Sequence, residues 1–361
     1  MLPLGAVLVV AAMAFGCHIP DLNRYDPVSD RLAGMGVSAP VSVVRDQNGV
    51  AHITASSEDD LFYAIGYSQA QDRFMMMDLM RRAGSGRLAE ILGSPVKYKG
   101  VDIPHLDIGL RTFRFAEAAR RGAAELDPES RRQLEAFTRG INRFLQDAGD
   151  SMPVYQAWKT RPEPWTIEDC FLTAEAMGLV EGVSSFFEEY YLERIRREKG
   201  DQARDLFVPQ YPEGGVIITN DQPLVAGSPL SFLARRFPSL GSNNWVISGK
   251  RTVSGKTIIA NDPHVPDSLI PTFWWHVQIK GGRYDVMGMM FPGFPCFGTA
   301  TNGRLAWALT NVMVDYFDVW REKINPSNPD QYLVGDQWTD FVKEPGVVKV
   351  RGKKPVPMSC G

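Results

Sequence analysis

Cysteine and histidine are scarce in this chain. Its 361 residues include five histidines and four cysteines, the latter at positions 17, 170, 296 and 360. Cysteines so few and so scattered exclude a disulfide framework and a zinc cluster. Charge is nearly balanced, with 39 Lys and Arg against 42 Asp and Glu, and no long basic run is present. Because a nucleic-acid-binding surface needs a local excess of cations, we expect no nucleic-acid partner.

Several catalytic signatures are missing from the sequence as well. It contains no Gly-x-Ser-x-Gly elbow, no His-Glu-x-x-His, no Walker loop and no Rossmann glycine fingerprint. A Ser-x-x-Lys does occur at Ser94–Lys97, and Ser242-Asn243-Asn244 loosely resembles the second element of penicillin-binding proteins. The matching Lys-Thr-Gly is absent, since Ile258 follows Thr257. A serine acyltransferase of the penicillin-binding type is therefore kept only as an alternative.

The N-terminus is apolar but short. Met1–Phe15 is almost wholly apolar, falls short of the ~20 residues that a bilayer-spanning helix needs, and is followed by Gly16 and Cys17. This pattern predicts a signal peptide over residues 1–16 and a periplasmic or otherwise exported protein. The residues before Cys17 resemble a bacterial lipobox, although no Lys or Arg precedes the apolar core. A membrane-anchored lipoprotein lipidated at Cys17 and a plain export signal with an unmodified cysteine both remain open.

The first half of the remaining chain is mainly helical in pattern. Residues 17–40 are polar and predict a tether, and residues 41–55 predict a β-hairpin around Asn48-Gly49. Apolar residues at spacings of three or four then predict a helix over 58–80. Asp127 before Pro128 predicts the start of a helix over 127–146, and Thr166 followed by Glu168 and Asp169 predicts the start of one over 166–199. Residues 209–241 are rich in Pro and Gly and predict a linker.

The second half has the pattern of a β-structure. Six β-rich runs are separated by Gly, Pro and Asn: Asn244–Ser248, Thr257–Ala260, Thr272–Lys280, Tyr284–Met290, Arg304–Leu309 and Tyr316–Glu322. Their close spacing, without long helices between them, predicts antiparallel pairing. The last segment, Val347–Gly361, is basic and Pro-rich and shows no strong core pattern. The fold class predicted for the whole is α+β.

Several separated motifs share one resemblance. The string GSNNWVISGKRTVSGKTIIANDPHVP begins at Gly241, and PGFPCFGTATNGRLAWALTNVMVDYFDVWRE follows it. Together they resemble the penicillin acylase family of N-terminal-nucleophile (Ntn) hydrolases. Upstream, VVRDQNGVAHI, DLFYAIGYSQAQDRFMMMDLMRR and SGRLAEILG resemble the small-subunit signature of that family. The resemblance covers about residues 41–341, in the order found in the family.

This resemblance implies an architecture. The fold would be the Ntn-hydrolase four-layer αββα sandwich, encoded here in part. Residues 41–208 would form a mainly helical small (α) subunit and residues 209–241 a spacer propeptide. Residues 242–361 would form the N-terminal part of a β-rich large (β) subunit. The two processed subunits would stay associated.

The resemblance also implies a mechanism. A serine hydroxyl is a weak nucleophile and needs a base. Here the base would be the α-amine of Ser242 itself, whose ordinary pKa is near ~8 and which exists only after the Gly241–Ser242 bond has been cleaved. Ser242 would perform that self-cleavage and then hydrolyse an acyl-amide substrate. A penicillin or cephalosporin side chain and an N-acyl homoserine lactone are the substrates considered.

Three supporting sites follow from the same resemblance. The imidazole or the backbone carbonyl of His264 would orient Ser242. The backbone N–H of Asn311 would line the oxyanion hole, where one such donor is typically worth ~3 kcal/mol. Val265 and Phe297 would contribute to an apolar acyl pocket. By contrast, we expect Phe273, Trp274 and Trp275 in the core.

A structural calcium ion is implied as well, one for each pair of subunits. Its ligands would be the carboxylates of Asp315 and Asp318, the carbonyl of Phe317 and either Glu188 or Glu189. Hard oxygen donors of this kind suit Ca²⁺. The ion would hold the two subunits together and would take no part in catalysis.

Two departures from the family pattern stand out. Ala300 occupies a position where glycine is usual, which puts the local backbone geometry in question. Family precursors are also longer, and the asparagine that supplies the second oxyanion donor would lie beyond Gly361. We therefore expect a fragment, and the alternative to the enzyme is a truncated, catalytically incompetent remnant.

Overall fold

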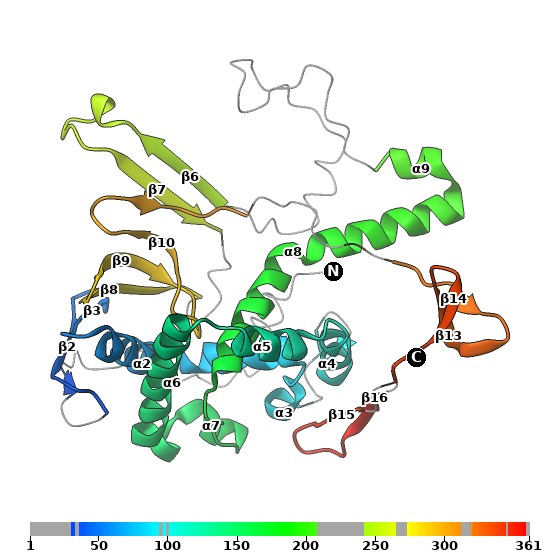
Figure 1. Ribbon diagram of the computed structural model, residues 1–361, viewed down its shortest axis with the longest axis horizontal. Coiled ribbons are helices and arrows are strands. Elements are labelled where there is room, and N and C mark those ends of the chain that lie inside the picture. The colour runs from blue at the N-terminus through cyan, green and yellow to red at the C-terminus, as the bar shows by residue number, and fades with distance from the viewer. Residues whose placement is uncertain are drawn as a thin grey trace.

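The computed structural model describes residues 30–32, 36–93, 97–98, 101–207, 242–264, 273–311, 318, 320–343 and 346–358, and Figure 1 shows their arrangement. The predicted signal peptide with Cys17 and the linker 209–241 with Gly241 lie outside this part of the chain, as does Ser94. None of the helices it describes is both long and apolar enough to cross a bilayer.

Helices dominate the first half and strands the second, so the α+β class is confirmed. The helices are α2 (Glu58–Ser85), α3 (Ala89–Leu92), α4 (Ile103–Arg111), α5 (Phe115–Ala124), α6 (Pro128–Ala148), α7 (Pro153–Trp158), α8 (Ile167–Lys199) and α9 (Asp201–Asp205). The strands of the largest sheet are β1 (Asp30–Leu32), β2 (Val41–Arg45), β3 (Ala51–Thr54), β8 (Trp275–Gly281), β9 (Tyr284–Met290), β10 (Phe297–Thr301) and β11 (Ala306–Trp307).

The smaller sheets come from shorter strands. They are β4 (Lys97–Tyr98) with β5 (Val101–Asp102), β6 (Ser242–Ile247) with β7 (Ile258–Pro263), β12 (Ile324–Asn325) with β13 (Asn328–Val334) and β14 (Gln337–Asp340), and β15 (Gly346–Val348) with β16 (Val356–Met358).

The three predicted helices are confirmed, and their starts are set by capping side chains. Ser57 accepts a hydrogen bond from the N–H of Asp60 at the start of α2, and Asp127 accepts from two N–H groups at the start of α6. Thr166 and Asp169 form a reciprocal capping box at the start of α8. Such caps satisfy N–H groups that the helix itself cannot pair.

The largest sheet joins the two halves of the sequence. Its order is β1-β2-β3-β8-β9-β10-β11, and the predicted hairpin is its β2–β3 pair. Strand β3 then runs parallel to β8, with Ala51 opposite Val277 and Thr54 opposite Lys280. The remaining neighbours in this sheet pair antiparallel. In Figure 1, α2 and α6 lie below β8 and β9 in the view, and the β6–β7 hairpin lies above them.

The β-rich runs were predicted with mixed success. Strand β9 has the predicted bounds, whereas the run at 304–309 contributes only the two residues of β11. Residues 320–322 are not in a strand, and most of the remaining 316–322 run lies outside the described residues. Ala300 lies in regular pairing within β10, opposite Gly288, so its replacement of glycine leaves the strand intact.

The last segment packs on the core although its sequence shows no strong core pattern. Val348 and Val350 are buried, and Arg351 donates its N–H to the carbonyl of Ala89 and a guanidinium N–H to that of Trp158. These two apolar residues and the hydrogen bonds of Arg351 fix the segment against the helices α3 and α7. Two buried residues are too few to produce a detectable hydrophobic period in the sequence.

The core lies around α2. Phe273 and Trp275 are buried in it as predicted. Helices α2 and α6 approach so closely that a Cβ atom at Gly140 would lie 1.9 Å from the carbonyl oxygen of Tyr63, and one at Gly66 would lie 2.0 Å from that of Phe137. The contact of these two helices therefore depends on a glycine in each.

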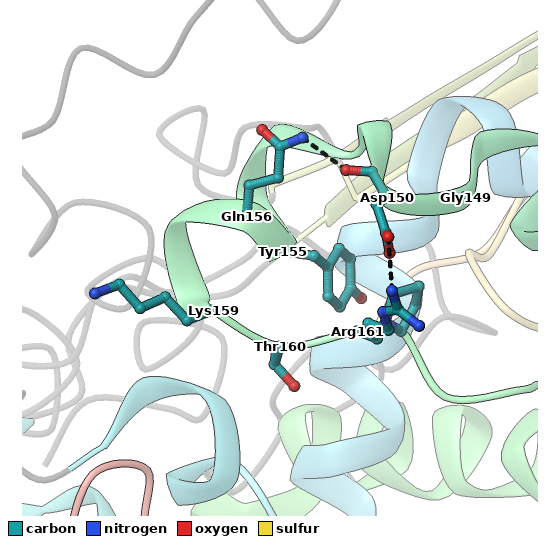
Figure 2. A pocket seen from close by; sticks show the side chains of 8 residues that line it. Gly149, Asp150, Tyr155, Gln156, Lys159, Thr160 and Arg161 are labelled. Atoms are coloured by element: carbon teal, nitrogen blue, oxygen red, sulfur yellow. Dashed lines mark hydrogen bonds and ion pairs between the residues drawn. The ribbon is translucent and has the colours of Figure 1, made fainter.

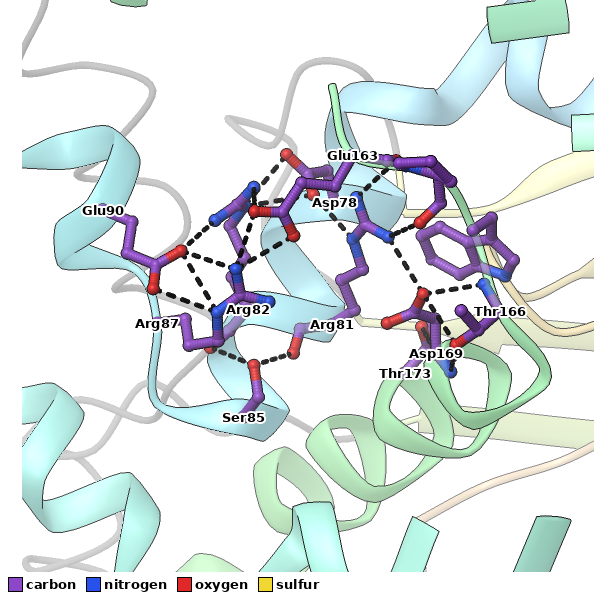
Figure 3. A network of polar contacts seen from close by, with 12 residues as sticks. Asp78, Arg81, Arg82, Ser85, Arg87, Glu90, Glu163, Thr166, Asp169 and Thr173 are labelled. Carbon is purple, nitrogen blue, oxygen red and sulfur yellow. Dashed lines mark hydrogen bonds and ion pairs between the residues drawn. The ribbon is translucent and has the colours of Figure 1, made fainter. Parts of the chain in front are cut away.

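A buried ionic network joins α2 to the first turn of α8 (Figure 3). The Asp78 carboxylate accepts from Arg81 at 2.7 Å, from Arg82 at 3.1 Å and from the Tyr155 hydroxyl at 2.7 Å. Burial opposes ionisation of Asp78, but the charges of Arg81 and Arg82 outweigh it and hold the pKa of Asp78 below its usual value. Arg81 continues the network to Asp169 at 3.0 Å.

The glycine contact predicts a stability difference. Gly140→Ala should lower the free energy of unfolding by about 1–3 kcal/mol, because the added methyl group forces α2 and α6 apart. The matched control is Gly178→Ala in α8, where no described heavy atom lies within 4 Å of the added Cβ. That substitution should be neutral or stabilising by up to about 1 kcal/mol, because alanine favours the helix. Urea unfolding measures both, and equal effects would contradict the close contact.

Candidate active site

Ser242 and His264 lie at the same end of one hairpin. Strands β6 and β7 pair antiparallel with Ser242 opposite Pro263, so His264 follows directly after the partner of Ser242. The β-branched and aromatic residues Trp245–Ile247 and Ile258–Ile259 favour these strands. The hairpin therefore brings together two residues that are 22 positions apart in the sequence.

The imidazole of His264 is exposed and contacts two neighbours. Its Nε2 lies 3.1 Å from the side-chain nitrogen of Asn243 and 3.2 Å from a carboxylate oxygen of Asp262. A neutral ring with its proton on Nδ1 accepts from Asn243, whereas a ring protonated on Nε2 donates to Asp262. The imidazole thus contacts the residue after Ser242, and the role of His264 in orienting Ser242 stays a prediction.

The segment that leads to Asn311 is fixed to the same hairpin. Asn261 of β7 donates its side-chain N–H groups to the carbonyl of Asn243 at 3.2 Å and to that of Leu309 at 2.8 Å. Its side-chain oxygen accepts from the N–H of Leu309 at 3.2 Å and from the hydroxyl of Thr299. Leu309 precedes Asn311 by two residues, so this network joins the predicted oxyanion segment to the strand that begins with Ser242.

The predicted acyl pocket is described only in part. Phe297 is half-buried at the start of β10, where its side chain packs on the core and its carbonyl accepts from the indole N–H of Trp307 at 3.2 Å. Val265 lies outside the described residues. The role of these two residues in a pocket therefore stays a prediction.

A pocket of about 280 Å³ lies elsewhere, beside α7 (Figure 2). Asp150 closes one side of it by accepting from the Gln156 side chain through its carbonyl and from Arg161 through its carboxylate. In Figure 1, α7 lies near the lower edge of the view and the β6–β7 hairpin near its upper left. This pocket thus shares no residue with the candidate site.

The predicted calcium ligands are likewise incomplete. Asp318 is described and exposed, and Glu189 lies half-buried in α8. Asp315, Phe317 and the side chain of Glu188 lie outside what the structure describes. Within the described ranges, no group of three or more His, Cys, Asp or Glu side chains is placed to hold a metal ion. The oxygen donors suit Ca²⁺ chemically, but their assembly stays a prediction.

The two described cysteines are poor candidates for a nucleophile. Burial raises the pKa of the Cys170 thiol to about 12 and also raises the pKa of Cys296. Only the thiolate is a strong nucleophile, and a raised pKa lowers the thiolate fraction of both residues.

Asn261 is the residue that sequence reasoning missed. It stands inside the quoted motif, yet no role was given to it. The signal was its residue type, because asparagine is depleted from strands and here directly follows the run Ile258–Ala260. A polar side chain at such a position indicates a partner, although the sequence does not say which.

Comparison with known proteins places these motifs in a family. Residues 40–359 match the penicillin amidase family model. The acyl-homoserine lactone acylase QuiP of Pseudomonas aeruginosa is 28% identical over 89% of this chain, and the penicillin acylase 2 proenzyme of Pseudomonas sp. (strain SE83) is 32% identical over 82%. A crystal structure of the thermostable penicillin G acylase of Alcaligenes faecalis aligns at a TM-score of 0.40 and 23% identity, over 52% of this chain and 97% of that one.

The chain belongs to the penicillin amidase family. It spans 39% of the length of each of the two curated relatives named above.

Proposed function

We propose that this chain is part of an amidohydrolase whose nucleophile is Ser242, freed as an N-terminal residue by self-cleavage. The observation that carries the proposal is the hydrogen-bonded hairpin end, where Ser242, His264 and the segment leading to Asn311 meet. The family match and the names of its relatives support amide hydrolysis. An Ntn-hydrolase four-layer sandwich is proposed on the same grounds.

Self-cleavage would begin with attack of the Ser242 hydroxyl on the Gly241 carbonyl carbon. The Gly241–Ser242 carbon–nitrogen bond breaks, the nitrogen takes up a proton, and an ester forms at the serine oxygen. Water then hydrolyses this ester and leaves a free α-amine on Ser242. That amine has an ordinary pKa near ~8, so it can act as a base at neutral pH, as a peptide nitrogen cannot.

Substrate hydrolysis would repeat the same chemistry. The α-amine takes the hydroxyl proton while the oxygen attacks the substrate amide, and the amine product leaves with that proton. Water then cleaves the acyl-enzyme and releases a carboxylic acid. The N–H of Asn311 would stabilise the oxyanion that forms in both steps. The substrate would be an N-acyl homoserine lactone or the acylated amine of a penicillin or cephalosporin.

Replacement of the nucleophile tests this function. The wild-type full-length gene product that contains this chain should appear in mass spectrometry as two polypeptides, the second starting at Ser242, and should release amine from an N-acyl homoserine lactone or penicillin. Ser242→Ala should remain one polypeptide and release none, because both steps need the hydroxyl.

Ser254→Ala is the matched control for this experiment. Ser254 lies in the exposed turn of the same hairpin, so its loss should leave cleavage and amine release unchanged. A wild-type chain that stays intact, or a Ser242→Ala chain that is cleaved, would overturn the proposal.

The geometry also predicts how His264 acts. His264→Gln should keep the amine-release rate within about tenfold of wild type, because the backbone carbonyl is retained and the imidazole contacts Asn243 and Asp262. Removing a general acid or base costs ~10²–10⁴-fold. A loss of that size, measured in steady-state kinetics with the variant still cleaved, would instead assign the role to the imidazole.

We also propose that Ca²⁺ binds Asp315, Asp318, the Phe317 carbonyl and Glu188 or Glu189 as a structural ion. Calcium should therefore raise the melting temperature of the chain above its value in EDTA. A ligand present at 100 times its dissociation constant stabilises by about 2.7 kcal/mol. Asp318→Asn should shrink this shift, whereas Asp285→Asn, a change at an exposed aspartate beside Lys280, should not. Equal shifts in the two variants would refute the site.

A further inference from the structure

The side chain of Asn261 has its hydrogen-bonding capacity filled. A side-chain amide offers two N–H donors and an oxygen with two lone pairs. Here the donors reach the carbonyls of Asn243 and Leu309, and the oxygen receives the Leu309 N–H and the Thr299 hydroxyl. Four partners on three segments of the chain fix one orientation of this amide.

The reverse orientation is excluded by the same partners. Rotation of the amide by 180° would place its NH₂ group against the Leu309 N–H and its oxygen against the carbonyls of Asn243 and Leu309. Donor would then face donor and acceptor would face acceptor. The amide of Asn261 thus pairs with both backbone groups of Leu309, as a residue of a neighbouring strand would do.

This pairing links the nucleophile strand to the oxyanion segment. Every hydrogen bond described between the β6–β7 hairpin and residues 299–309 runs through the Asn261 side chain. On one side it holds Asn243, the residue after Ser242. On the other it holds Leu309, two residues before Asn311. A shift of this amide would therefore change the distance between the attacking oxygen and the oxyanion donor.

We propose that Asn261 is a positioning residue that sets the placement of the Asn311 N–H relative to Ser242. The catalytic part of this inference rests on the proposed function, whereas the anchoring of Leu309 does not. A misplacement of about 1 Å at a reacting centre can cost ~10²-fold in rate. An alanine at this position would remove all four hydrogen bonds and leave the β6–β7 ladder itself intact.

Hydrogen exchange followed by mass spectrometry tests the anchoring without any need for activity. In Asn261→Ala, the Leu309 amide should lose protection, whereas the amides of β8 and β9 should keep theirs, which shows that the fold persists. Asn261→Asp should retain protection at Leu309, because its carboxylate still accepts from that N–H. In the control, Asn325→Ala, the protection at Leu309 should equal that of wild type. Unchanged protection in Asn261→Ala overturns the inference.

Steady-state kinetics then test the positioning. Asn261→Ala should lower kcat by about 100-fold with KM changed less than about threefold, since the donor is misplaced in the transition state while the substrate still binds. Asn261→Asp should also lower kcat, because its carboxylate no longer donates to the Leu309 carbonyl. The positioning role is overturned if kcat is unchanged in both variants while the Leu309 amide has lost its exchange protection in Asn261→Ala. Inactive wild-type protein instead refutes the proposed function, and the exchange result still decides the anchoring.

Discussion

The parallel pairing of β3 with β8 is the contact on which the rest of the structure depends. It joins residues 51–54 to residues 277–280, and closing so long a loop carries an entropic cost. Burial of Ala51, Ile53, Val277 and Ile279 at this pairing compensates for part of it. Once β8 is in place, β9 and β10 follow by antiparallel pairing, and β10 presents Thr299 to Asn261. The hydrogen bond from Thr299 to Asn261 at the candidate site therefore depends on the β3–β8 pairing, which lies elsewhere in the sheet.

The elements that sequence could predict are those defined by neighbouring residues. Asp127 before Pro128, and Thr166 three residues before Asp169, locate helix starts because a cap acts within one turn. The short helices α3, α4, α5 and α7 escaped prediction, since only their packing makes them stable. The parallel partner of β3 also could not be foreseen, because period-two alternation identifies a strand and says nothing of which strand lies beside it.

In the candidate site, too, only the residues that are close in the sequence could be predicted. Ser242 and His264 could be proposed from a motif whose members lie on one hairpin, and the structure places them at one end of it. Asn261 could not, because its role comes from Leu309 and Thr299, which approach it only through the fold of the sheet. The sequence shows only that Asn261 is a polar residue in a strand. Its role depends on Leu309, 48 positions away, whose carbonyl accepts a hydrogen bond from it.

The site differs from the core in what holds it together. Around α2 the contacts are apolar and close, down to glycines at a helix crossing. The β6–β7 hairpin instead exposes Trp245, Val246 and Ile258, and its described hydrogen bonds to residues 299–309 all run through the Asn261 amide. Regions with few buried apolar contacts open at lower free energy than the core. Because those few hydrogen bonds are directional, they can hold the hairpin in a defined orientation without deep burial, as the two reactions proposed for Ser242 would require.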